Sequence, residues 1–374
     1  MENQKETIAW VDWIRALATL GVVLIHTAGP LLYGYNQIPE SYWWISNIYD
    51  SAARMCVPLF FMISGFLLLQ QDDSLKTFFS KRIHKVFIPF LAWSMFFIFW
   101  KVYVERSALL SPDSLFSLVY KPAYFHLWFL YALIGVYLSV PLLKVIVKHA
   151  TTTVLHYGVA LWFVTASLMH MIEEFTVIQG SIDLRFMAGY SGFMLLGWLL
   201  GKKSVSKKNA VAACILAFLC IVSTALITYV LTLRNGGTLV DYFYGPTTPI
   251  VIVLSGSVFL VIRYAVENYH IAINEKVLLA VRSISASSFG IYMVHVVFLY
   301  LLRHGHLGIY LYADRWHPLI GIPVVTGVAF FLSYGTIHLI RKISLPIVIQ
   351  ATSSIKGGLM RFLRKSGPMR KLTS

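Results

Sequence analysis

The chain has 374 residues, of which 58% are hydrophobic and 13% are charged, and its mean hydropathy is +0.71. Soluble domains average about 45–50% apolar and about 25% charged residues, so this composition excludes a water-soluble globule, a disordered chain and a nucleic-acid-binding protein of the usual kind. The net charge of +15 therefore indicates Lys/Arg-rich cytoplasmic loops of a membrane protein rather than a nucleic-acid partner.

Hydropathy predicts ten helices of about the length that crosses a hydrocarbon core of roughly 30 Å. The sixth is short and rich in glycine, so we expect it to be broken or closely packed. The predicted fold is therefore all-α and polytopic. The predicted spans are residues 9–32, 44–70, 84–104, 125–147, 152–172, 186–201, 209–232, 247–265, 286–303 and 318–341.

Lysine and arginine alternate between the connections. Even-numbered connections are rich in both residues and odd-numbered ones are poor, which predicts that both termini lie in the cytoplasm. We expect residues 1–341 to form one transmembrane domain and residues 342–374 to form a basic cytoplasmic tail against anionic lipid. The three cysteines fall in apolar segments and form no metal-binding pattern, so no metal site is predicted.

The first predicted span carries Arg15 and His26. Ionisable residues within a span cost about 2.5–3.5 kcal/mol, so they are the first candidates for function. Eleven residues separate the two side chains by roughly 16 Å along a helix, with Arg15 near the cytoplasmic boundary and His26 near the outer one. Spacing alone leaves a structural alternative open, in which Arg15 pairs with Asp12 and lipid phosphate and His26 only makes a hydrogen bond.

The second and third spans add further charges. Asp50 and Arg54 form an i,i+4 pair in the outer half of the second span, and Arg54 lies at about the depth of His26. An ion pair that stabilises only its own helix is the alternative. Arg82 and Lys85 open the third span, where a topology signal and a phosphate-binding site explain them equally well.

The fourth and ninth spans contain polar residues at depth. His126 and Trp128 lie at the outer start of the fourth span. An aromatic belt accounts for Trp128, whereas His126 needs a partner or a role. Tyr292 and His295 lie at mid-depth in the ninth span. Lone buried histidines are more often structural than catalytic, so both interpretations of His295 stay open.

These segments together resemble the acyltransferase-3 family of polytopic membrane acyltransferases over essentially the whole chain. The family usually has Arg-x-x-Arg at the start of its third helix, where this chain has Arg82-x-x-Lys85. Within the family the chain is most similar to the type that O-acetylates enterobacterial common antigen. The resemblance rests on Arg15-x10-His26, residues 57–66 (VPLFFMISGF), 126–130 (HLWFL) and 288–295 (SFGIYMVH) and, for the antigen type, on 51–54 (SAAR) and Lys121-Pro122.

The resemblance implies transfer of an acetyl group from cytoplasmic acetyl-CoA to a hydroxyl of an extracytoplasmic or lipid-linked surface polysaccharide. It implies a bacterial cytoplasmic membrane location, with acetyl-CoA as co-substrate and no permanently bound cofactor. The other expected partners are the acceptor glycan and the lipid bilayer, and homo-oligomerisation stays open. Two alternatives remain: a transporter of glycan or lipid-linked sugar without covalent chemistry, and an acyltransferase with a non-glycan acceptor.

We therefore expect His26 to be the general base, because a histidine with a reference pKa of about 6.5 suits deprotonation of a hydroxyl near neutral pH. Arg54 is the expected oxyanion partner, with His126 as a third catalytic residue. His295 is the next candidate base. Trp128, Tyr292 and His295 are the expected substrate contacts, and Arg15, Arg82 and Lys85, with Arg282 as a weaker fourth, are the expected CoA phosphate ligands.

Overall fold

The computed structural model describes residues 8–107, 116, 118, 120–177, 189–268 and 275–365, with side chains as far as residue 343. The regular elements within these ranges are helices, and nine helical stretches among them are long and apolar enough to cross a membrane. A tenth apolar helix, α10, is shorter. The predicted all-α polytopic fold is confirmed, and the orientation of the termini remains a prediction.

The helices follow one another with short connections, and several long ones are interrupted by a π-helical or 3-10 turn. Their bounds are α1 Ala9–Leu32, α2 Glu40–Ala53, α3 Cys56–Leu68, α4 Leu75–Arg82, η1 Ile83–Phe87, α5 Ile88–Tyr103, η3 Phe125–Leu127, α7 Trp128–His149, α8 Thr152–Phe163, η4 Val164–Met169, α9 His170–Phe175, α10 Ser191–Lys202, α11 Lys207–Arg234, η6 Tyr242–Tyr244, α12 Pro249–Asn268, α13 Glu275–Arg303 and α14 Pro318–Lys365.

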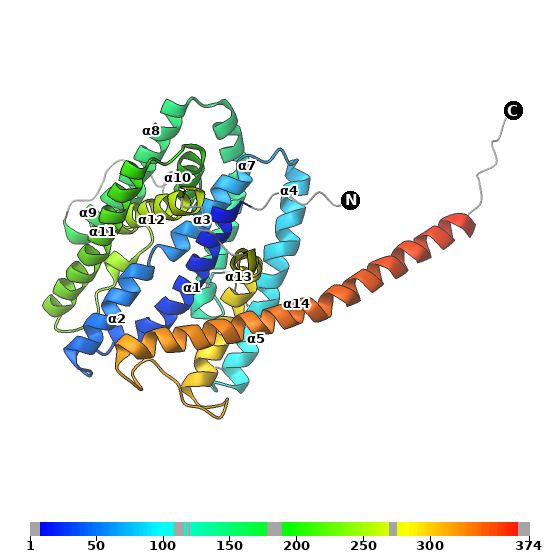
Figure 1. Cartoon of the computed structure of the whole chain (residues 1–374). Coiled ribbons are helices and arrows are strands. Elements are labelled where there is room, and N and C mark those ends of the chain that lie inside the picture. Colours follow the sequence, from blue (N-terminus) through cyan, green and yellow to red (C-terminus); the bar gives the residue numbers. More distant parts are fainter. Residues whose placement is uncertain are drawn as a thin grey trace.

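Helix α1 lies at the centre of the bundle (Figure 1). It packs against α2, α3, α12, α13 and α14, while α10 packs on α3 and α11 packs on α12. More than half of α1 is buried within the protein, against just over a quarter of α7 or α11. Polar side chains of α1 therefore face neighbouring helices instead of lipid.

The predicted span 44–70 is two helices, α2 and α3, separated by a turn at Arg54 and Met55. Pro58 has no N–H to donate to the carbonyl of residue 54, so a continuous helix cannot pass this point without a lost hydrogen bond. The helix resumes with the bond from Leu59 N to Met55 O, at 3.0 Å. The break places Arg54 at a helix end in the interior of the bundle.

Close glycine packing joins α3 and α10, as expected for the sixth predicted span. A Cβ added at Gly65 would overlap the backbone of Met194, and one added at Gly197 would overlap the backbone of Met62. Helix α10 has 12 residues, or about 18 Å. The two backbones thus approach as closely as small residues allow.

The third and tenth spans are longer than predicted. Helix α4 begins at Leu75, where Ser74 Oγ accepts a hydrogen bond from Thr77 N, and the π-helical η1 separates it from α5. Helix α14 continues across residue 341 to Lys365 and projects from the bundle at its red end (Figure 1). The division of the chain at residue 341 stays a prediction.

Candidate active site

A cavity of about 230 Å³, here called the arginine cavity, lies between α1, α3, α4, α7 and α13. Arg15 and Arg82 both line it, so two of the predicted phosphate ligands meet although they lie 67 positions apart (82 − 15). Its other polar lining residues are Ser64, Tyr137, Ser288 and Tyr292.

Arg15 is held from α13 as well as from its own helix. Its Nη1 donates to Ser285 Oγ at 3.0 Å, and Ser285 Oγ donates to Asp12 Oδ1 at 2.6 Å. The carboxylate of Asp12 lies 3.8 Å from Arg15 Nη1. The expected Asp12–Arg15 pair therefore exists, and it fixes Arg15 inside the protein while leaving it in the wall of the arginine cavity.

Arg82 is held by aromatic rings. Its guanidinium lies 5.1 Å from the ring centroid of Phe78 and 5.3 Å from that of Tyr137, within cation–π range. Its Nε is buried and, among the described residues, has no hydrogen-bond partner. An unsatisfied buried donor of this kind can bind an anionic oxygen entering the cavity.

Lys85 and Arg282 do not line the arginine cavity in the described part of the chain. Lys85 is exposed on η1, and the wider π-helical turn rotates it away from the face that Arg82 occupies. Arg282 lies on α13 one turn before Ser285, and its buried Nε also has no partner among the described residues. The structure thus brings Arg15 and Arg82 together in the arginine cavity and places the other two predicted cations outside it.

A smaller cavity of about 110 Å³, the histidine cavity, adjoins the first. His26, Arg54, His126 and Trp128 all line it, so it brings together the predicted base, the predicted oxyanion partner and two of their predicted neighbours. Phe129 and Tyr292 line both cavities. The hydroxyl of Tyr292 donates to the main-chain carbonyl of His126 and so ties α13 to the start of α7.

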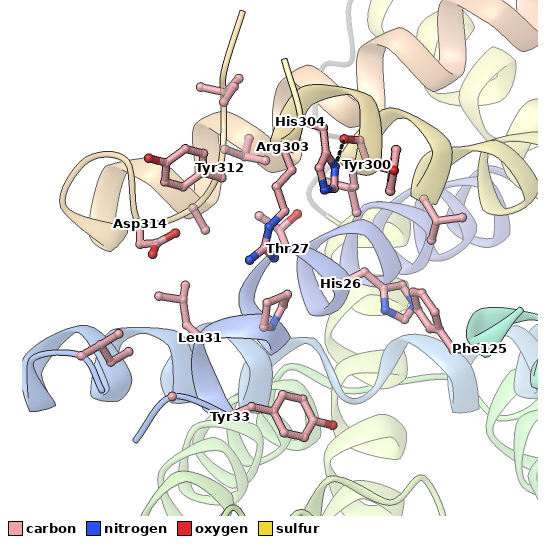
Figure 2. A pocket seen from close by; sticks show the side chains of 18 of the residues that line it. His26, Thr27, Leu31, Tyr33, Phe125, Tyr300, Arg303, His304, Tyr312 and Asp314 are labelled. Carbon is pink, nitrogen blue, oxygen red and sulfur yellow. Dashed lines mark hydrogen bonds between the residues drawn. The ribbon is translucent and has the colours of Figure 1, made fainter. Parts of the chain in front are cut away.

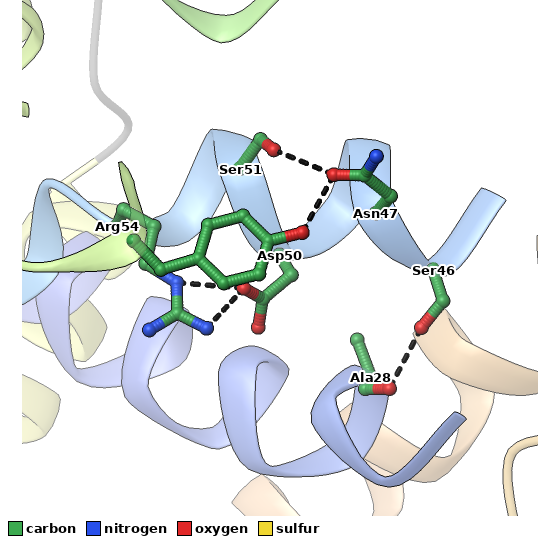
Figure 3. A network of polar contacts seen from close by, with 7 residues as sticks. Ala28, Ser46, Asn47, Asp50, Ser51 and Arg54 are labelled. Carbon is green, nitrogen blue, oxygen red and sulfur yellow. Dashed lines mark hydrogen bonds and ion pairs between the residues drawn. The ribbon is translucent and has the colours of Figure 1, made fainter. Parts of the chain in front are cut away.

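Arg54 is fixed by a buried polar network (Figure 3). Its Nε donates to Asp50 Oδ2 at 2.6 Å, its Nη2 contacts the same oxygen, and Asp50 is fully buried. The guanidinium lies 4.1 Å from the ring centroid of Tyr244, whose hydroxyl donates to Asn47 Oδ1 at 2.6 Å. The predicted ion pair is therefore present, and it also orients Arg54 beside His26.

The three candidate histidines form one cluster. The ring centroids of His26 and His295 are 5.2 Å apart and nearly parallel, and those of His126 and His295 are 5.5 Å apart. His295 is fully buried, and its Nδ1 lies 2.7 Å from the carbonyl of Tyr292. Within the described residues His295 lines neither cavity, so it contacts His26 by ring stacking on the side away from the histidine cavity. Both ring nitrogens of His126 are buried without a partner among the described residues.

His26 also lines a third cavity, the aromatic cavity, of about 370 Å³ (Figure 2). This cavity lies between the end of α1, the end of α13 and the loop before α14, at the opposite end of the bundle from Arg15. Figure 2 shows Arg303 extending from the end of α13 toward Thr27. Besides His26, its aromatic and charged lining residues are Tyr33, Tyr124, Phe125, Tyr300, Arg303, His304, Tyr312 and Asp314.

Sequence reasoning missed Tyr137, Tyr244 and Arg303. Tyr137 lies eight residues after Phe129 on α7, so helical spacing could have placed it on the same face. Tyr244 and Arg303 reach the site only through the packing of distant segments, for which the sequence holds no local signal. No group of three or more His, Cys, Asp or Glu side chains in the described ranges is placed to hold a metal ion.

The chain was compared with protein families, curated proteins and solved structures. A family model described as an acyltransferase domain matches residues 8–338. No curated protein and no solved structure matches. The matched region contains every residue of the three cavities.

Proposed function

The chain belongs to the acyltransferase-3 family of membrane acyltransferases, and on this premise we propose that it transfers an acetyl group from acetyl-CoA to a hydroxyl of a surface polysaccharide or lipid-linked glycan. The proposed location is the bacterial cytoplasmic membrane, with the donor entering from the cytoplasm. The similarity of residues 51–54 and of Lys121-Pro122 to the enterobacterial common antigen type supports a glycan acceptor.

The observation that carries the proposal is the position of His26 between two cavities. The histidine cavity adjoins the arginine cavity with its two cations, and the two cavities share Phe129 and Tyr292 in their walls. The aromatic cavity approaches His26 from the other end of the bundle. A donor and an acceptor entering from opposite ends would therefore meet at one histidine.

The proposed chemistry is direct acyl transfer. His26 removes the proton of the acceptor hydroxyl while the hydroxyl oxygen attacks the thioester carbonyl carbon. The oxyanion of the tetrahedral intermediate is stabilised by Arg54, which Asp50 and Tyr244 hold in place. The carbon–sulfur bond then breaks, the thiolate leaves as CoA and takes up a proton, and the acetyl ester remains on the acceptor.

The volume of the histidine cavity supports acetyl over longer acyl groups. A cavity of about 150 Å³ in another protein admits benzene, with its six carbon atoms. At about 110 Å³ the histidine cavity suits the three non-hydrogen atoms of an acetyl group and little more. Trp128 and the buried His126 form part of its wall, so both would restrict the acyl group and orient the acceptor side.

The proposal is tested by reconstituting the purified chain with radiolabelled acetyl-CoA and candidate glycan acceptors, and by mass spectrometry of surface glycans from cells with and without the protein. The expected result is label in the glycan and an added acetyl mass only when the chain is present. Glycan that crosses the membrane without gaining an acetyl group would favour the transporter, and label in a non-glycan product would assign another acceptor.

A further inference from the structure

A fourth cavity, the lysine cavity, has a volume of about 730 Å³ and lies where α3, α7 and α10 end and α4 begins. It is at the same end of the bundle as the start of α1. Its wall includes Lys144 and Lys148 of α7, Lys202 and Trp198 of α10, and the connection from Leu69 to Leu75. The mechanism proposed above uses none of these residues.

The lining of this cavity carries three lysines against two carboxylates, Asp72 and Asp73, and Asp73 pairs with Lys81 at 3.0 Å, so the positive charge is only partly neutralised. Lys148 lies 3.7 Å from Asp72, but both side chains are largely exposed, so that pair contributes little. Lys144 lies over the ring of Phe78 at 5.0 Å and Lys202 over the ring of Trp198 at 5.8 Å. Neither lysine has a carboxylate within ion-pair distance among the described residues.

Trp198 adds an unsatisfied donor. Its Nε1 is buried and has no hydrogen-bond partner in the described part of the chain, although its side chain lines the cavity. A buried indole N–H usually finds an acceptor. The cavity thus combines ammonium groups for an anion with the flat ring of Trp198, which suits a ligand that joins a phosphate to a heteroaromatic base.

The lysine cavity lies further along the same face of α7 as the arginine cavity. Lys144 and Arg82 both lie near the ring of Phe78, with their charged groups 5.0 and 5.1 Å from its centroid. Helix α7 also lines both cavities with one stripe of residues three or four positions apart, which share a helix face. The stripe consists of Phe129, Leu133 and Tyr137 in the arginine cavity and Pro141, Lys144 and Lys148 in the lysine cavity.

We propose that the lysine cavity binds the nucleotide end of acetyl-CoA, with the 3′-phosphate on Lys144 and Lys202 and the adenine against Trp198. The inference rests on the proposed function, because it places the remainder of the same donor. Phe129 and Lys144 are 15 residues apart on α7, roughly 22 Å along the helix, which leaves room for the pantetheine arm past Arg82. A phosphomonoester carries close to two negative charges at neutral pH, and lysines bind it as point charges.

The test compares acetyl-CoA with acetyl-dephospho-CoA, which lacks only the 3′-phosphate. Binding of both to the purified full chain in phosphatidylcholine vesicles is measured directly, and acetyl transfer is measured in parallel. Wild type should bind acetyl-CoA more tightly. The Lys144→Gln/Lys202→Gln variant should bind acetyl-CoA on the order of tenfold more weakly, and acetyl-dephospho-CoA within twofold of wild type.

The matched control is Lys207→Gln/Lys208→Gln, which removes two exposed lysines from the start of α11 at the same end of the bundle, outside the lysine cavity. It should keep the preference for the 3′-phosphate. Equal weakening of both donors in the cavity variant, or an unchanged preference, overturns the proposal. Phosphatidylglycerol added to the vesicles tests a lipid phosphate as the ligand. If it activates wild type but not the cavity variant, and the variant keeps its preference for acetyl-CoA over acetyl-dephospho-CoA, the cavity binds a lipid phosphate and the nucleotide site is overturned.

These outcomes separate the inference from the proposed function. If the chain binds acetyl-CoA without a preference for the 3′-phosphate and still transfers acetyl, the nucleotide site in the lysine cavity is refuted and the acetyltransferase function is supported. If the preference for the 3′-phosphate depends on the two lysines but no glycan is acetylated, the nucleotide site is supported and the proposed reaction is refuted. If neither acetyl-CoA nor acetyl-dephospho-CoA binds, the nucleotide site and the acetyltransferase function are both overturned.

Discussion

Variants of Arg54 can separate its proposed role in stabilising the oxyanion from its contribution to folding. The guanidinium pairs with Asp50, which is fully buried, so Arg54→Ala alone would leave an uncompensated charge in the protein interior. Breaking a buried pair in this way costs about 3–5 kcal/mol of stability. The informative variant is therefore Asp50→Asn/Arg54→Gln, which removes both charges and keeps two side chains able to hydrogen-bond.

The expected loss is set by the position of Arg54 in the wall of the histidine cavity beside His26. Removing one oxyanion donor from a water-excluded site typically lowers kcat by about 10² to 10³, or roughly 2.7–4 kcal/mol of transition-state stabilisation. The double variant should lose this much in kcat while its KM for acetyl-CoA changes less than threefold. Asp50→Asn alone, which keeps Arg54, should lose far less.

The assay is steady-state acetyl transfer in vesicles, with thermal unfolding measured on the same preparations. The double variant should unfold within a few degrees of wild type, and Arg54→Ala should unfold at a lower temperature. A double variant with kcat within threefold of wild type would refute the role of Arg54. An equal loss in Asp50→Asn would instead assign the effect to the polar network that includes Tyr244.

Three further outcomes are expected. His26→Gln should abolish acetyl transfer while acetyl-CoA binding stays within twofold, measured by equilibrium binding; residual transfer above a tenth of wild type would shift the base to His295. Gly197→Ala should lower the free energy of unfolding by about 1–3 kcal/mol, because the added Cβ meets the backbone of Met62. Gly135→Ala, which has open space around it, is the control and should leave the free energy of unfolding unchanged. Identical thermal unfolding curves for the two variants would contradict the α3–α10 packing. Reporter fusions after Lys208 and after the C-terminus should both read cytoplasmic, and an external reading of either would reject the topology.

Much of the fold could be predicted because a helix that crosses a bilayer needs about 20 mostly apolar residues. Ten apolar segments were sufficient for the helical class. The break between α2 and α3 was harder to place, since Pro58 interrupts an apolar run that hydropathy averages over. The start of α4 at Leu75 was missed because its first turns are polar enough to resemble a loop.

The site was partly predictable for a related reason. Arg15, His26 and Arg54 could be singled out because ionisable groups within apolar spans are costly and need a purpose. Tyr244 could not be singled out from the sequence. Aromatic residues make up 15% of the chain, and sequence spacing does not show which of them contacts Arg54. Lys85 was grouped with Arg82 because both open the third predicted span, and the sequence gives no sign of the π-helical turn of η1 that turns Lys85 away.

The position of His26 between two cavities has an electrical consequence for the proposed reaction. The acceptor hydroxyl gives up a proton near one face of the bilayer, and the CoA thiolate takes one up from the other. If those were different protons, every turnover would move one elementary charge through the membrane, worth about 2.3 kcal/mol per 100 mV. A histidine reached from both cavities can pass the same proton from the hydroxyl to the thiolate. The acetyl group, formally an acylium cation, then moves outward in exchange for one proton that moves inward, and no net charge crosses the membrane. The turnover rate would then couple to the membrane voltage only weakly.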